Sequence, residues 1–425
     1  MTYQEFFNKS QEKGITNIQI TEKETIDSSV EIINGKLESY DDYDNTDYNI
    51  KAEYKDKTVK ISSGYLDEDI IDLIILKVEA TDTSYEDEYL EKKDIIKKNK
   101  RPNIDISNEV KILKDLNNLR EKYKEVDKLT TYFSETYTNT RIINMNGVDI
   151  STDSHLSSFL VEAIVNNNGD ITSFDRKILT TDKKEIDFQS FTEDVMVKTI
   201  LQSNRERLET KKYNIILDSS TASNIISHLT DMLSATSIRN KVSCLENKLN
   251  KKVFSESLNI IEDPTNKDYP GYRLFDDEGT LTSKKQIIEN GKLKTYLYNI
   301  KEAKIKKVQS TGNGYGGIGT KNMYVLPGDK TQEELFSTIQ DGIYITDYMG
   351  SMRTSISTVN GQISLQVFGF IIKDGKLVSG FEPSIMTTTI FELLSNIKEI
   401  GNDLNFTNTS TASPSLYIEN ISIAR

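Results

Sequence analysis

The chain has 425 residues and a formal net charge of −13, and 36% of its residues are hydrophobic and 28% charged. This composition predicts a soluble, folded protein of two or three domains and excludes a disordered chain. The longest apolar run is far shorter than the roughly 20 residues that a membrane span requires, and the N-terminus lacks the pattern of a signal peptide. The short apolar runs lead us to expect no membrane contact. Because the single cysteine also excludes internal disulfides, we expect a cytoplasmic protein.

The first unit, residues 1–107, is predicted as an α+β subdomain that ends in a linker. Helix patterns lie at 2–14 and 67–81, and the strands between them include a turn at Asn34-Gly35, the strongest short signal for a β-hairpin. The linker holds a basic stretch, 92–101, between acidic residues and a proline. We interpret it as a solvated face or linker, and we expect no direct binding of nucleic acid.

The second unit, residues 108–210, is also predicted as an α+β subdomain. Residues 109–129 have the spacing of a long amphipathic helix, and residues 187–209 indicate a second helix. Between them, residues 130–180 alternate like a meander of antiparallel strands with two Asn-Gly turns.

The third unit, residues 211–425, is predicted to be a β-rich domain. A short apolar strand ends at Asp218, a good N-terminal helix cap, and residues 225–235 then carry apolar side chains on one helix face. Most of the remainder alternates like strands, with turns at 290–291 and 374–375 and helices at 333–340 and 388–400. Because no helix–strand alternation of the βαβ kind occurs, the predicted fold class is α+β: a mixed N-terminal region with antiparallel strands, followed by a β-rich C-terminal domain.

The residue counts restrict the chemistry that this chain can carry. Two histidines, His155 and His228, and one cysteine, Cys244, are nearly the whole supply of the nitrogen and sulfur ligands that zinc prefers. The sequence has no HExxH, CxxC or HxH motif, and no GxSxG accompanies either histidine. We expect His155 to be a partly exposed strand histidine. A magnesium or calcium site built only from carboxylates stays open, although no EF-hand loop is present.

Residues 310–322, STGNGYGGIGTKN, hold five glycines. Neither a phosphate loop nor a dinucleotide fingerprint fits, because the segment that follows has the pattern of a strand rather than a helix. Two interpretations stay open: a flexible connection, or a loop that lets a peptide backbone approach closely because glycine has no Cβ. Under the second interpretation Gly314, Gly316 and Gly317 are candidate peptide-binding residues.

A strand pair predicted at 344–350 and 354–372 is rich in Ser, Thr and Gly. Its polar first half, with Ser355 and Ser357, would lie beside a cleft and pair with an extended peptide through main-chain hydrogen bonds. The alternative is an ordinary strand of the sheet.

The order of several segments along the whole chain resembles the TldD/PmbA family, and within it the PmbA (TldE) branch. The resemblance is loose in VEIINGKLESYDD and TRIINMNGVDIST, in the first 200 residues. It is specific in the later segments SHLTDMLSA, DDEGTLTSKKQIIENGKLKTYLYNIKEAKI, QSTGNGYGG, NMYVLPGDKTQEELFSTIQDGIYITDYMG and GNDL. The family fold that it implies is a mixed N-terminal region followed by a β-rich C-terminal domain of the TldD/PmbA type.

The resemblance also implies that a zinc site is degenerate in this chain. TldD subunits carry an HExxxH helix whose two histidines, with a later cysteine, bind zinc and whose glutamate is the general base. In this chain Ser227 and Met232 stand at the two ligand positions, and His228 stands where the glutamate would be. No cysteine follows GNDL. We therefore expect no catalytic residue and no cofactor in this chain, with zinc held by a TldD-type partner and His228 serving in packing or hydrogen bonding.

The function that the resemblance implies is that of the non-catalytic subunit of a TldD/TldE-type metallopeptidase, which degrades or trims unfolded peptides and has been linked to modulation of DNA gyrase. Its expected partners are a TldD-like catalytic subunit, a second copy of itself in a dimer, or both, together with an unfolded peptide. One alternative is a homodimeric peptide-binding or regulatory protein without hydrolytic activity. Another is an independent enzyme that uses carboxylates or a distant metal site.

Overall fold

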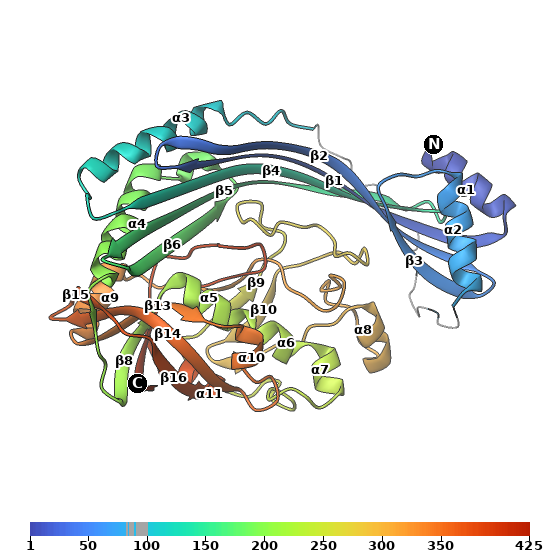
Figure 1. The fold of residues 1–425 in the computed structure, drawn as a ribbon. Helices are drawn as coiled ribbons and strands as arrows, with labels where there is room; N and C mark the ends of the chain where they lie inside the picture. Colours follow the sequence, from blue (N-terminus) through green and yellow to red (C-terminus); the bar gives the residue numbers. More distant parts are fainter. Residues whose placement is uncertain (82–83, 85–88, 91–100) are drawn as a thin grey trace.

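The computed structural model describes residues 1–81, 84, 89–90 and 101–425. Except for Arg101, the basic stretch 92–101 lies outside the described residues. A long arched β-sheet extends over a C-terminal body that contains two further sheets (Figure 1). The strands pair mostly antiparallel and are accompanied by helices, which confirms the predicted α+β class.

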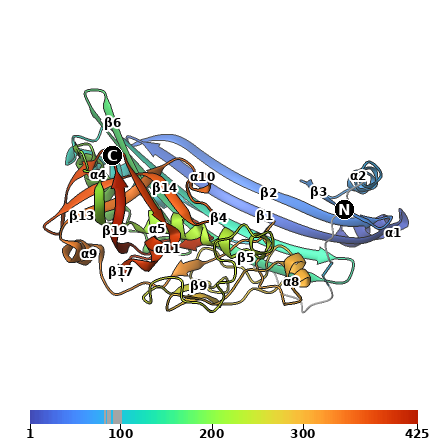
Figure 2. The ribbon, with the colours of Figure 1, turned by 90° about the horizontal axis from the view of Figure 1, so that it is seen from below.

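The arch is a six-stranded antiparallel sheet. Its strands are β1 (Ile15–Ile33), β2 (Lys36–Tyr54), β3 (Lys57–Ser63), β4 (Lys128–Asn144), β5 (Asp149–Asn167) and β6 (Asp170–Thr180), in the order β3-β2-β1-β4-β5-β6. Figure 2 shows the long strands of the arch running from the C-terminal body toward the end that carries the N-terminus, where β3 lies, while β6 lies at the opposite end. The first two predicted units contribute to the same sheet, because β1 pairs with β4 along most of its length.

The hairpins of the arch turn at residues with a left-handed backbone. Asn34 and Gly35 have φ angles of 49° and 76°, as a type I′ turn requires, and such a turn has the twist of the strands that it joins. Lys55 and Asp56, with φ angles of 48° and 58°, make the next turn without glycine. The turn at Asn34-Gly35 is predicted by the sequence.

Helices cover both ends of the arch. They are α1 (Tyr3–Glu12) and α2 (Glu68–Glu79) at the N-terminal end, and α3 (Ser107–Leu116), the 3-10 turns η1 (Asn117–Glu121) and η2 (Lys183–Glu185), and α4 (Phe188–Gln202) at the other (Figure 1). At the N-terminal end, Phe6, Ile71 and Ile74 are fully buried in one cluster with Ile18 and Ile20 of the sheet. Burial of each such side chain contributes roughly 1.5–3 kcal/mol.

Two helices of the second unit are shorter than predicted. The helix predicted at 109–129 ends at Leu116 and continues as η1, because the guanidinium of Arg120 donates hydrogen bonds to the carbonyls of Val126 and Asp127 and closes the chain into a turn before β4. The helix predicted at 187–209 ends at Gln202, because the next residues form β7 (Arg205–Glu206) at the edge of the C-terminal body.

The larger sheet of the C-terminal body has eight strands. They are β7, β8 (Lys211–Leu217), β13 (Gly342–Met349), β14 (Gln362–Lys373), β15 (Lys376–Phe381), β16 (Ser384–Thr389), β17 (Ile397–Ile400) and β19 (Leu416–Ala424). Their order is β13-β8-β19-β16-β14-β15-β7, and β17 pairs with β19. Since β13 also pairs with β14, five of these strands close into a ring.

The smaller sheet has five short strands, in the order β11-β10-β9-β12-β18. They are β9 (Ile260–Glu262), β10 (Lys285–Glu289), β11 (Lys292–Leu293), β12 (Met323–Val325) and β18 (Thr411–Ala412). The helices of the body are α5 (Ser219–Ser227), α6 (Leu229–Leu233), α7 (Ala235–Arg239), α8 (Ile300–Lys306), α9 (Gln332–Ile339), α10 (Met352–Ser355) and α11 (Ile390–Ser395).

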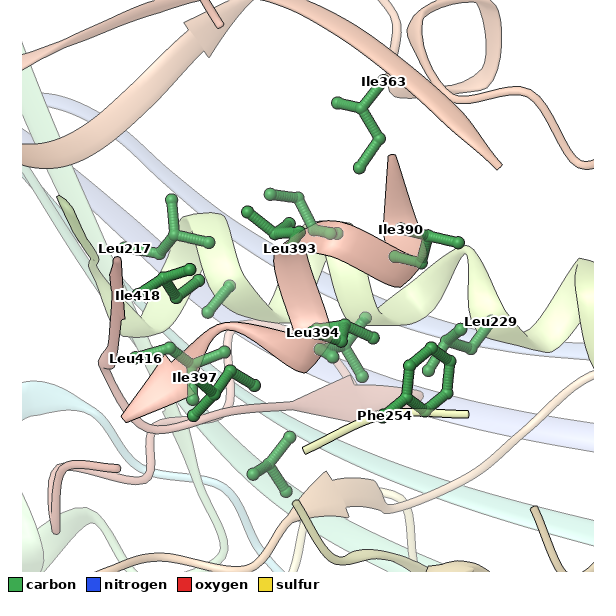
Figure 3. Close-up of a cluster of buried hydrophobic side chains, with 14 of the residues drawn as sticks. Leu217, Leu229, Phe254, Ile363, Ile390, Leu393, Leu394, Ile397, Leu416 and Ile418 are labelled. Carbon is green, nitrogen blue, oxygen red and sulfur yellow. The ribbon is translucent and has the colours of Figure 1, made fainter. Parts of the chain in front are cut away.

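The core of the body lies between its sheets and α5, α6 and α11. Figure 3 shows Leu229 of α6, Phe254, and Ile390, Leu393 and Leu394 of α11 gathered in one apolar cluster. The helix predicted at 388–400 ends at Ser395, because the chain then extends into β17 and pairs with β19.

The strand predicted at 354–372 begins only at Gln362, so Ser355 and Ser357 do not lie on a strand. Ser355 ends α10, and Ser357 lies in a turn closed by a hydrogen bond from Gly361 N to the Ser357 carbonyl. Gly361 has a φ of 73°, which lets the chain reverse into β14.

Within the described ranges, no helix is long and apolar enough to cross a membrane.

Candidate functional site

The segment that would hold the metal motif forms two short helices, α5 and α6, which meet at His228. The carboxylate of Asp218 caps α5 by accepting a 2.7 Å hydrogen bond from Thr221 N, as predicted from its position. The predicted apolar face is also confirmed. Its residues, Ile225, Ile226, Leu229, Met232 and Leu233, are at most 1% exposed. His228 is half-buried at the junction.

The side chains of Ser227 and Met232, at the two ligand positions of the motif, do not suit zinc. The Ser227 hydroxyl donates to the Asn224 carbonyl at 2.7 Å, and the Met232 thioether is fully buried in the core. The nearby Cys244 thiol has its pKa raised by burial, which favours the protonated form over the thiolate that binds metals. Zinc takes thiolate, imidazole or carboxylate ligands. Within the described part of the chain, no three His, Cys, Asp or Glu side chains are grouped to hold a metal.

The second histidine, His155, has a structural role. It is an exposed residue of β5, and its Nε2 lies 2.8 Å from Oε1 of Glu135 on β4. Lys183 binds the other oxygen of Glu135 at 2.9 Å. As predicted, this is a strand histidine, and it is far along the sequence from the helix of His228.

A cavity of about 580 Å³ lies between the underside of the arch and the loops of the C-terminal body. Its lining on the arch consists mainly of alternating residues of β1 to β4, which share one face of the sheet because side chains alternate along a strand. Arg273, Asp277 and Glu278 of a loop, the start of α8 and Gly316 form the opposite wall. The lining includes Gly316, whereas Ser355 and Ser357 do not contribute to it.

The three candidate glycines are not equivalent. A Cβ on Gly314 would lie 2.5 Å from the side chain of Glu278, so the space beside this glycine is already filled. Gly316 has a φ of 70° and open space beside it, and Gly317 also has open space. Only at Gly316 and Gly317, therefore, is there room for another chain to approach.

A buried polar network supports the glycine loop. Glu262 of β9, which is fully buried, pairs with Lys285 at 2.8 Å. Both of its carboxylate oxygens accept from the amide of Asn313, at 2.9 and 3.0 Å, and one also accepts from Lys321 N. Since a buried charge is stable only when it is paired and hydrogen-bonded, Glu262 ties the loop rigidly to the small sheet.

Asp276 anchors the same loop from the other side. Its carboxylate accepts from Gly314 N at 2.8 Å, Thr280 N at 2.8 Å and Glu278 N at 3.0 Å. Burial raises the pKa of Asp276 to about 7, although these three donors favour the charged form.

A second cavity, of about 190 Å³, adjoins the first, and Lys23, Thr140 and Arg273 line both. Lys321 lines the second cavity and donates to Thr409 Oγ1 at 2.8 Å. Burial and the nearby Arg273 lower the pKa of Lys321. Sequence reasoning does not identify these cations, although Arg273 and Lys321 flank the family-like segments DDEG and QSTGNGYGG.

Comparison with protein families matches two segments of the chain. Residues 210–425 match the family model described as the PmbA/TldA metallopeptidase C-terminal domain, and residues 99–202 match the model of its central domain. The first of these segments alone covers half of the chain.

Similar curated proteins include members of both branches. A metalloprotease PmbA homolog from Buchnera aphidicola is 31% identical over 208 residues, which cover 49% of this chain and 45% of that protein. A metalloprotease TldD homolog from the same organism is 31% identical over 174 residues, covering 39% of this chain and 35% of that protein. The matched part thus spans half or less of the length of these relatives.

Solved structures match the whole fold. A protein from Thermotoga maritima, named as a proposed modulator of a DNA gyrase, superimposes with a TM-score of 0.87 at 23% identity, over 100% of both chains. TldE from Thermococcus kodakarensis superimposes with a TM-score of 0.84 at 18% identity, over 99% of both chains. At these identities the likeness establishes the fold.

Proposed function

Since the chain belongs to the PmbA/TldA metallopeptidase family, we propose that it is the non-catalytic, TldE-like subunit of a TldD/TldE-type peptidase that degrades or processes unfolded peptides. The observation that carries the proposal is the state of the α5–α6 segment. Its helices are retained, but the ligand positions hold Ser227, bonded to the backbone, and Met232, buried in the core.

In this proposal the partner is a TldD-like chain that supplies the zinc, and the present chain contributes scaffold and peptide-binding surface. The Gly316 side of the glycine loop, which borders the larger cavity, supports a role in holding peptide. The proposal includes a cytoplasmic location, for which the lack of internal disulfides is the supporting feature.

The test is reconstitution of the pair. The chain is co-expressed with a TldD-type chain that carries HExxxH, and each chain and the mixture are assayed on an unfolded peptide, with light scattering to measure mass. We expect co-purification, with cleavage by the mixture far above that of this chain alone. A mutant partner whose HExxxH glutamate is changed to glutamine controls for contaminating proteases.

The alternative, a homodimeric peptide-binding protein, predicts a different result. This chain would then form a dimer by itself, bind peptide without cleaving it, and fail to associate with the TldD-type chain. Cleavage by the present chain alone, abolished by a chelator, would contradict both and favour an independent metalloenzyme.

A further inference from the structure

The outer edge of β2 is unpaired along more than half of the strand. β3 pairs with β2 only from Tyr48 to Tyr54, so the stretch from Leu37 to Asp47 has β1 on one side and no described strand on the other. Figure 2 shows β2 along the outer boundary of the arch. Within the described residues, no backbone hydrogen bond from another segment reaches this edge. Because alternate residues of an edge strand point their N–H and C=O groups outward, the stretch offers main-chain partners to a further strand.

The opposite edge of the same sheet is partly closed. Leu179 N of β6 donates to the Phe406 carbonyl at 2.8 Å, and the Lys177 carbonyl accepts from the side-chain amide of Asn405 at 3.2 Å. Phe406 and Asn405 belong to the C-terminal body. The fold therefore uses the body to satisfy one edge of the arch and leaves the edge at β2 open.

The open stretch also exposes apolar side chains on both faces of the sheet. Leu37, Tyr40 and Tyr43 are 50%, 45% and 50% exposed. The register sets Tyr40 opposite Val30 and Tyr43 opposite Asp27, so the two rings lie on opposite faces. A further strand beside β2 would cover part of each side chain through cross-strand contacts.

The charge of the stretch restricts which strand can pair with it. Residues 37–47 include five acidic residues and no basic one. The carboxylates of Glu38 and Asp41 are exposed and have no hydrogen-bond or ion-pair partner among the described residues. The other three carboxylates each have one partner, of which only Arg101 is charged: Asp42 accepts from the Ser28 hydroxyl, Asp44 pairs with Arg101, and Asp47 accepts from the Asn45 amide. The edge therefore keeps a net negative charge.

This charge excludes a second copy of β2 as the added strand. Carboxylates would then face carboxylates, and like charges directly opposite each other destabilise a sheet. Charged side chains on an edge strand commonly prevent edge-to-edge association. That role accounts for the acidic residues but not for the exposed Leu37, Tyr40 and Tyr43. A strand that carries Lys or Arg beside apolar residues suits both the charges and the apolar side chains.

We propose that the free edge of β2, from Leu37 to Asp47, pairs with an extended peptide segment that is rich in Lys and Arg and also carries apolar side chains. The proposal rests on the proposed function and deepens it, since it names the class of unfolded peptide that this chain holds. Main-chain pairing suits an unfolded peptide, because it requires no folded shape, and the side chains add the preference for positive charge. A strand of this length spans roughly 35 Å.

The free edge leads to the cavity beneath the arch. It ends where β3 begins to pair, with Tyr48 opposite Ser63. The next residues inward, Asn49 and Ser62, line the cavity of about 580 Å³, and Ser62 Oγ donates to Asn49 Oδ1 at 2.6 Å. A peptide paired with the edge would have one end beside this cavity, which Gly316 also lines.

The test measures binding to this chain alone. Fluorescence anisotropy is recorded with a labelled, unstructured peptide of about ten residues in which Lys is interspersed with apolar residues. One control peptide carries Glu at each Lys position, and another keeps the Lys residues but has N-methyl groups on its backbone amides. We expect the Lys peptide to bind, with an affinity that falls as salt is added. Both control peptides should bind at least roughly tenfold more weakly, the first through charge repulsion and the second because it cannot donate main-chain hydrogen bonds.

Variants of the chain locate the site. Glu38→Gln and Asp41→Asn should each weaken binding of the Lys peptide roughly threefold, because each removes an exposed carboxylate from the edge strand. Asp329→Asn is the matched control: it removes an exposed carboxylate from the loop before α9 and should leave the affinity unchanged. Circular dichroism establishes that all three variants are folded.

Equal affinity for the Lys and Glu peptides, undiminished binding of the N-methylated peptide, or equal effects of the three variants would overturn the proposal. Absence of binding would also overturn it, and the carboxylates would then serve only to prevent self-association. Failure of the chain to pair with a TldD-type subunit bears only on the proposed function, because binding here is read without that subunit.

Discussion

The Sδ atom of Met232 lies 3.7 Å from the Sγ atom of Cys244, the only cysteine of the chain. Under the proposed function, Met232 stands at the second ligand position of the motif, and its thioether makes an apolar sulfur contact there. This contact packs the helix against the segment that carries Cys244.

Met232→Ala should destabilise the protein by about 2–5 kcal/mol, because it removes a fully buried side chain and leaves a cavity in the core of the C-terminal body. Denaturant unfolding followed by circular dichroism measures this change. Met349→Ala is the control, since Met349 is 61% exposed and its loss should cost less than about 0.5 kcal/mol. Equal effects of the two substitutions would show that Met232 is not a core residue.

The purified chain should hold no stoichiometric zinc, because the donors near His228 are a backbone-bonded hydroxyl, a thioether and a protonated thiol. Elemental analysis after dialysis against a weak chelator measures the metal content. One zinc per chain that survives dialysis would contradict this prediction and the proposed division of labour.

Glu262→Ala should cost about 3–5 kcal/mol, because it leaves the largely buried ammonium of Lys285 without its partner. Glu256→Ala removes an exposed carboxylate from an i,i+4 pair with Lys252 and should change stability by less than about 1 kcal/mol. Thermal or denaturant unfolding distinguishes the two. If Glu262→Ala has no larger effect than Glu256→Ala, the network does not stabilise the glycine loop.

Asp276 should make stability depend on pH. Its pKa is raised by burial to about 7 in the folded protein, so the folded state keeps a proton that the unfolded chain has lost above about pH 4. Its contribution to stability is therefore full in acid and declines as pH rises, by roughly 1.4 kcal/mol per pH unit between about pH 5 and 7.

Asp276→Asn removes this titration. Unfolding is measured for both proteins across the same pH range, and the stability of the native protein relative to the variant should fall as pH rises. A difference that stays constant, or rises with pH, would mean that the three N–H donors keep Asp276 ionised in the folded state.

Gly317→Val should fold normally, because nothing lies within 4 Å of its added Cβ, whereas Gly316→Val should lose about 1–3 kcal/mol at a φ of 70°. If the loop admits a peptide backbone, Gly317→Val should lower cleavage by the reconstituted pair without changing the thermal midpoint of this chain. Full cleavage by a folded and paired Gly317→Val variant would identify the loop as a surface connection only.

The sequence by itself determined the elements whose signals lie within a few residues. The cap at Asp218, the turn at Asn34-Gly35 and the apolar face of 225–233 all depend on backbone preferences and on periodicity, and the structure contains each of them. The segments that resemble the TldD/PmbA family also predict a degenerate zinc motif, because the spacing of that motif is local.

Only the tertiary structure decided where helices end and which charges meet. Arg120 closes a turn on carbonyls beyond the helix, and β17 forms because β19 lies beside it; neither contact is visible in local periodicity. Lys23, Arg273 and Lys321 share one cavity although about 250 residues separate the first from the second. Long-range contacts of this kind depend on how the arch packs over the body, and the sequence pattern of any one segment carries no record of that packing.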